Sequence, residues 1–100
     1  MATQYTMTET PTPAALAGVR ADFERKRSES YMAYAAKREA LRAAYRGAVM
    51  GGKVSAKVAE RALEALQEGE DAAMAEYRER GASLVAEYDA ARVAAGFSPL

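Results

Sequence analysis

Four carboxylates in the second half of the chain have a spacing that could bind metal. Glu60, Glu64, Glu68 and Asp71 are separated by three or four residues, so a helix would carry them on one face. Helical bundles that bind two metal ions complete such a set with Glu-x-x-His pairs. The chain has no His. We therefore interpret the row as a solvated or ion-paired face and expect no metal site.

A glycine-rich segment at the centre of the chain resembles the start of a phosphate-binding loop. Gly47, Gly52 and Lys53 have P-loop spacing, but that motif continues with Ser or Thr and follows a buried strand. Here Val54 follows, and the preceding run favours a helix. With neither His nor Cys, the usual nucleophile–base pairs are also absent. The sequence predicts a hairpin tip, no cofactor and no enzymatic activity.

Basic residues in the first half could contact phosphate groups. They form the cluster Arg25-Lys26-Arg27 and the row Lys37, Arg38, Arg42 and Arg46. The net charge of the chain is zero, and the second half supplies acids that could face these bases. We expect them to pair within the protein, so nucleic acid is not an expected partner.

The composition favours long helices over a thick globular core. Alanine provides 25 of the apolar residues, whereas Leu, Val and Phe together number 14 and Ile is absent. Ala, Glu, Arg and Leu are strong helix formers. No apolar run is long enough to span a membrane, and the first residues lack the pattern of a signal peptide. We expect a soluble protein with no membrane partner. Ten Arg against four Lys, with no Ile, suggests a GC-rich bacterial or phage genome, so the expected location is a bacterial cytoplasm or a virion.

Helix start and stop signals divide the chain. Thr12-Pro13 predicts the start of a helix over 13–46, with Gly47 just past its end, and a turn over 47–54 follows. Ser55 caps a second helix over 55–95, and 96–100 is a tail. The expected contact residues of the first helix are Leu16, Val19, Phe23, Tyr31, Tyr34, Leu41 and Tyr45. Those of the second helix are Leu63, Leu66, Ala73, Tyr77, Leu84, Tyr88 and Ala91.

These elements predict an all-α fold, an antiparallel, coiled-coil-like hairpin of two long helices over 13–100 with an extended N-terminal arm over 1–12. Folding back at Gly51 makes facing residue numbers sum to about 102. This register pairs Lys26 with Glu76 and Arg42 with Glu60, and it places Phe23 near Tyr77. Gly69 and Gly81 then either admit bulky side chains or bend the helix.

The same register leaves an acidic patch without cations. Glu68, Glu70 and Asp71 would face the segment 30–34, which contains Tyr31 and Tyr34 but no base. We interpret these five residues as a candidate partner-binding site, with an ordinary solvated patch as the alternative. In the arm, Tyr5 and Met7 alternate with polar residues. They either contact a neighbouring copy or belong to a frayed terminus.

Apolar residues outside the seam between the helices indicate a protein partner. Tyr31, Met32, Met74, Val85 and Val93 cannot all point into one seam. We expect a non-enzymatic structural or assembly protein that forms a homo-oligomer or docks on a larger protein assembly. A small phage virion component is one possibility. The alternative is a small inhibitor or adaptor that binds one host protein.

A further alternative comes from the outline of the hairpin. In length and outline it resembles the Trp-x-Gly family of type VII secretion substrates, and Tyr45-Arg46-Gly47 occupies the place of that tripeptide. The chain has no Trp, and Tyr88 is followed four residues later by Arg92 instead of the acid of the family's export signal. The resemblance implies a secreted helical-hairpin substrate of a type VII-like system.

Overall fold

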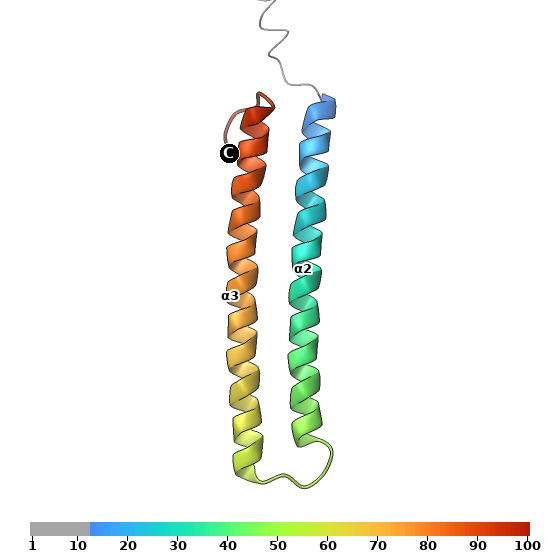
Figure 1. The fold of residues 1–100 in the computed structure, drawn as a ribbon, viewed down its shortest axis with the longest axis vertical. Helices are drawn as coiled ribbons and strands as arrows, with labels where there is room; N and C mark the ends of the chain where they lie inside the picture. Colours follow the sequence, from blue (N-terminus) through green and yellow to red (C-terminus); the bar gives the residue numbers. More distant parts are fainter. Residues whose placement is uncertain (1–12) are drawn as a thin grey trace, which may run out of the picture. The chain divides into compact units, whose positions relative to one another are not determined.

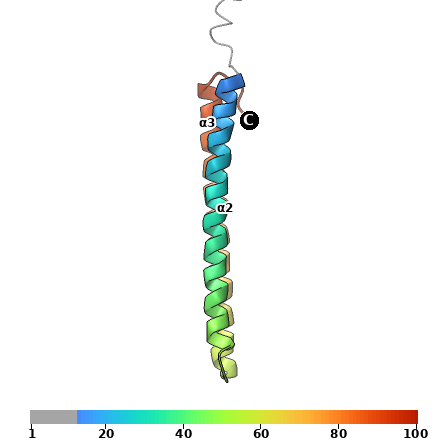
Figure 2. The ribbon, with the colours of Figure 1, turned by 90° about the vertical axis from the view of Figure 1, so that its right-hand side faces the viewer.

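The computed structural model describes residues 13–100, which form two long helices, α2 (Pro13–Val49) and α3 (Ala56–Ala94). The helices run in opposite directions, as the colours of Figure 1 show, so the predicted helical hairpin is confirmed. In the view turned by 90°, α2 lies in front of α3 (Figure 2). The helices contain 86% of the described residues. The predicted arm over 1–12, with Tyr5, Met7 and the Thr12 cap, lies outside the described residues.

The connection between the helices differs from the predicted turn. Helix α2 continues past Gly47 to Val49, and the Met50 amide still donates to the Arg46 carbonyl oxygen at 2.9 Å. Gly47 is therefore a helical residue and does not end α2. Ser55 precedes α3 and acts as its cap, because its Oγ accepts a hydrogen bond from the Val58 amide at 3.2 Å.

Helix α3 ends at a glycine with a left-handed backbone. Gly96 has a φ of 94°, which glycine adopts without a Cβ clash. The Phe97 amide donates to the Arg92 carbonyl oxygen at 2.9 Å, and the Gly96 amide donates to that of Val93 at 3.0 Å. These two bonds form a Schellman motif, which satisfies carbonyl groups in the last turn.

Contacts divide the chain into two compact units. The terminal unit contains residues 13–28 and 81–100, and the turn unit contains residues 29–80. In the terminal unit Phe23 stacks on Tyr88 with ring centroids 4.6 Å apart, and Leu84 is 1% exposed. In the turn unit Tyr34 stacks on Tyr77 at 4.8 Å, and Ala73 is 5% exposed. Each unit is thus an antiparallel helix pair held by a narrow line of apolar contacts.

The predicted register of the helices is wrong by about three turns. Lys26 pairs with Glu87 instead of Glu76, and Arg42 pairs with Glu70 instead of Glu60. Phe23 stacks on Tyr88, eleven positions beyond the expected Tyr77. Facing residue numbers therefore sum to 111–113 instead of about 102. The connection 50–55 is centred after Gly51, and α3 begins beyond the last turn of α2 (Figure 1).

A shift of three turns keeps the same faces in contact. Eleven residues complete almost a whole number of turns at about 3.6 residues each, so most predicted seam residues still lie in the seam. Tyr31 and Leu63 are exceptions, since they are 54% and 42% exposed. The observed register brings Leu63 level with the end of α2, and Figure 1 shows α3 beginning beyond the last turn of α2. The start of α3 therefore has little of α2 to pack against.

Gly69 has a packing role that Gly81 lacks. A Cβ at Gly69 would lie 2.5 Å from Cδ2 and 3.3 Å from Cγ of Leu41, whereas a Cβ at Gly81 would meet nothing within 4 Å. The close-packing interpretation therefore holds for Gly69, whose neighbour across the seam is Leu41.

This difference predicts opposite effects of alanine at the two glycines. Gly81→Ala should stabilise the chain by roughly 0.5–1 kcal/mol, because alanine loses less backbone entropy in a helix. Gly69→Ala should gain the same amount but lose about 1–3 kcal/mol through overpacking against Leu41. Urea unfolding followed by circular dichroism measures both. Equal stabilisation by the two substitutions would show that Leu41 does not occupy the space above Gly69.

Candidate protein interface

Three tyrosines form an aromatic group in the turn unit. Tyr34 is half-buried because it stacks on Tyr77, whereas Tyr31 is 54% exposed. The Tyr31 ring lies edge-on to Tyr77 at 6.2 Å and is 6.5 Å from Tyr34. The guanidinium of Arg38 lies over the Tyr34 ring at 5.4 Å. Of the two predicted partner-binding tyrosines, Tyr31 therefore has the more accessible ring.

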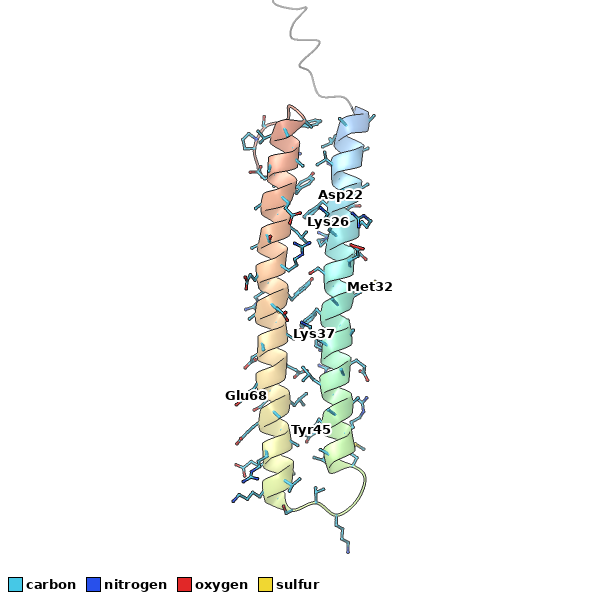
Figure 3. The ribbon with its side chains drawn as sticks, viewed as in Figure 1. Asp22, Lys26, Met32, Lys37, Tyr45 and Glu68 are labelled. Atoms are coloured by element: carbon cyan, nitrogen blue, oxygen red, sulfur yellow. The ribbon has the colours of Figure 1, made fainter. Side chains whose placement is uncertain are left out.

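The three acids of the predicted patch occupy different environments. The Arg42 Nε lies 3.0 Å from Glu70 Oε2, with Arg38 Nε at 4.0 Å, so the expectation that Glu70 lacks a cation is wrong. The corrected register causes this pairing. Glu68 points outward from α3, away from α2 (Figure 3), and Asp71 is exposed. The structure does not bring Glu68 to the tyrosines, and the binding role of the five residues stays a prediction.

Two cross-helix ion pairs mark opposite faces of the turn unit. Arg42–Glu70 crosses one face, and Lys37–Glu76 crosses the other. Lys37 and Arg42 differ by about 140° around α2, at about 100° per residue, which puts them on opposite sides of the seam. Residues at helical spacing from Arg42 or Glu70 therefore lie on one face, and residues at helical spacing from Lys37 or Glu76 lie on the other.

Large apolar side chains share the Arg42–Glu70 face. Tyr31 precedes Arg42 by eleven residues, or three turns. Leu63 and Met74 lie seven residues before and four residues after Glu70. We define the Arg42–Glu70 face by these five residues. The surface combines exposed Tyr31 and Leu63, half-buried Met74 and a salt bridge between the helices.

A groove in the terminal unit has ionised groups beside an apolar wall. It has a volume of about 520 Å³, and Val19, Phe23 and Leu84 line it. Lys26 Nζ lies 3.2 Å from both Asp22 Oδ2 and Glu87 Oε1. Hydrogen bonds to Asp22 and then Glu87 raise the pKa of Lys26. A lysine base needs a lowered pKa, so Lys26 is poorly suited to proton abstraction.

Tyr88 in the terminal unit lies between two arginines. Hydrogen bonds with Arg20 and then Arg92 lower the pKa of the Tyr88 hydroxyl from its ordinary value of 10.0. The Arg92 guanidinium also lies 5.7 Å from the Tyr88 ring centroid and 5.6 Å from that of Phe97. Its Nη2 donates to the Ser98 carbonyl oxygen at 3.1 Å. Arg92 thus links the last turn of α3 to the segment that follows it.

We expect Tyr88 to ionise before a free tyrosine does. The lowered pKa means that folding gains stability from tyrosinate above the unfolded pKa, and this gain is lost as pH falls through the folded pKa. Carbon-13 NMR of the labelled tyrosine ring, assigned with Tyr88→Phe, should show the early titration. Arg20→Gln should move it towards 10.0, while Arg27→Gln, whose side chain lies over Phe23, should not. An unchanged Tyr88 titration in Arg20→Gln would contradict the assigned cause.

No family model matches the chain, and neither curated proteins nor solved structures gave a match. Within residues 13–100, no three His, Cys, Asp or Glu side chains gather in a way that could hold a metal ion. Neither of the two described helices is long and apolar enough to cross a membrane.

Sequence reasoning missed two of these groups. The Arg20–Tyr88–Arg92 cluster had one usable signal, since Tyr88 and Arg92 are four residues apart and thus adjacent on a helix. The Arg42–Glu70 face also had one usable signal, because Leu63 and Met74 are eleven residues, or three turns, apart on the same helix. The position of Arg20 beside Tyr88 could not be predicted, because it depends on the register of the helices and the predicted register was wrong.

Proposed function

We propose that this chain is a non-enzymatic structural protein that self-associates or docks on a larger protein assembly. The observation that supports this most is its scarcity of buried side chains. Among the described residues whose burial is known, only Ala73 and Leu84 are buried, while nine large hydrophobic side chains are exposed. A core of this size leaves little net stability for an isolated chain, and association would cover more apolar surface.

The local chemistry also favours a structural role over catalysis. The chain has no His or Cys, and Lys26 in the groove is ion-paired. The ion pairs of the two units are at least partly exposed, so solvent screens them and they add little to the stability of the fold. Assignment to a phage virion stays a prediction from composition.

Light scattering coupled to size-exclusion chromatography tests the proposal. The weight-average mass should exceed the chain mass of 10.7 kDa and rise with loading concentration. If the chain remains at this mass, pull-down from native cells with mass spectrometry should identify a stoichiometric protein assembly. A monomer that is stable on its own and co-purifies with no assembly would contradict the proposal.

A further inference from the structure

We propose that a second copy of this chain docks on the Arg42–Glu70 face of the turn unit, with α2 of each copy lying over α3 of the other. This inference rests on the proposed self-association and deepens it by naming the partner and the surface. The pairing would convert the two helices of the turn unit into a four-helix arrangement.

The apolar residues distinguish this face from the opposite one. Tyr31 is 54% exposed, Leu63 is 42% exposed, and Met74 on the same face is half-buried. Across the seam, Ala33, Ala40 and Ala44 lie at helical spacing from Lys37 and present only methyl groups. Val58 on α3, at 46% exposed, is the large apolar side chain of that face. Tyrosine and methionine are enriched at protein interfaces. The larger apolar area therefore lies on the Arg42–Glu70 face.

The charge on the two helices indicates a second copy as the occupant. Within the turn unit, α2 carries two more bases than acids, whereas α3 carries three more acids than bases. Placing α2 of one copy over α3 of the other brings opposite charges together twice. The alternative, α2 over α2 and α3 over α3, brings like charges together twice. Charge complementarity thus favours a twofold axis parallel to the helices.

The helix register makes the pairing specific. Facing residues in the turn unit have numbers that sum to about 111, so positions 46 and 64 lie at the same level. With a twofold axis parallel to the helices, Arg46 of one copy lies level with Glu64 of the second. Both side chains are exposed. Arg46 holds only the intrahelical partner Glu39 at 2.7 Å, and Glu64 has no ion pair within residues 13–100.

Sedimentation equilibrium of the full chain tests the surface. Leu63→Lys should raise the dimer dissociation constant at least about tenfold, because it places a charge in the apolar part of the interface. Val58→Lys is the matched control. Val58 is 46% exposed on the same helix, and it lies eighteen residues, or five turns, before Glu76 and hence on the other face. It should change the dissociation constant less than about twofold, and circular dichroism should show equal helicity for both variants.

Mixing two charge variants tests the geometry. Arg46→Glu and Glu64→Arg should each weaken the homodimer. In either variant, positions 46 and 64 of opposite copies carry like charges, and the twofold axis repeats this pair. An equimolar mixture should form a heterodimer about tenfold more stable than either homodimer, since every pair is then complementary. Restoration upon mixing requires contact between copies, so rearrangement within one chain cannot produce it.

Each outcome decides between the two proposals. A dimer weakened by Leu63→Lys and restored by the charge mixture supports this inference. If Leu63→Lys does not change the dissociation constant of the oligomer, or if Val58→Lys changes it equally, the inference is overturned. Self-association through another surface then still stands. A dimer that Leu63→Lys weakens but mixing does not restore overturns the α2-over-α3 geometry. A wild-type monomer at every concentration overturns the inference together with the self-association on which it rests.

Discussion

Leu84→Ala should reduce the free energy of unfolding by about 2–5 kcal/mol, the cost of removing a buried leucine and leaving a cavity. Leu84 is 1% exposed and is the largest fully buried side chain among the described residues. It also lines the groove beside Val19 and Phe23, so few neighbouring atoms could move to fill the lost volume. Native domains have about 5–15 kcal/mol of total stability, so this one substitution should remove a large share of it.

Val85 is the matched control, because it follows Leu84 in the same helix and is 48% exposed. Val85→Ala should cost no more than about 0.5 kcal/mol, as expected for a surface site, and alanine also favours the helix. Urea unfolding monitored by circular dichroism gives both free energies. Comparable losses at the two positions would show that Leu84 is not the core of the terminal unit.

Tyr77→Ala should destabilise the turn unit by roughly 2–3 kcal/mol, somewhat less than the usual aromatic-to-alanine cost because the side chain is only half-buried. The substitution removes the stack on Tyr34 at 4.8 Å and the edge contact with Tyr31 at 6.2 Å. Tyr77→Phe keeps both ring contacts and should have little effect. Thermal melts of the three proteins provide the comparison.

A double-mutant cycle would test the register directly. Tyr34→Ala and Tyr77→Ala should be coupled by about 0.5–1.5 kcal/mol, as for other contacting aromatic pairs. Tyr45→Ala with Tyr77→Ala should be additive, because Tyr45 lies eleven residues, or about 16 Å, further along α2 than Tyr34. Additivity of the Tyr34–Tyr77 pair would contradict the observed register.

Periodicity predicted which faces of the helices meet but not how far one helix is displaced along the other. Leu16, Phe23, Leu66 and Leu84 were assigned to the seam because their spacing follows the helical repeat, and none is exposed. A displacement of eleven residues preserves this spacing, and it still offers Lys26 and Arg42 a carboxylate. Charge matching could therefore not fix the register. The stacked rings and the fit of Leu41 above Gly69 discriminate between the alternatives.

The candidate interface was less predictable because it depends on that register. Tyr31 was named from the sequence, and its ring is exposed. Glu70 was named because no cation was expected beside it, and this reason fails once Arg42 lies opposite. Leu63 was placed in the seam, since its spacing from Leu66 suits a buried position. Leu63 is exposed because α2 ends at Val49, level with it. No residue in the 47–54 segment indicated that α2 would end there.

The concentration dependence of the melting temperature tests most directly whether this chain completes its core by association. Dissociation accompanies unfolding if the folded state is an oligomer, so mass action stabilises the folded state as concentration rises. Circular dichroism melts of the unmodified chain over about a hundredfold range of concentration should show the midpoint rising by several degrees. A sharp, reversible transition well above room temperature with the same midpoint throughout that range would contradict the account.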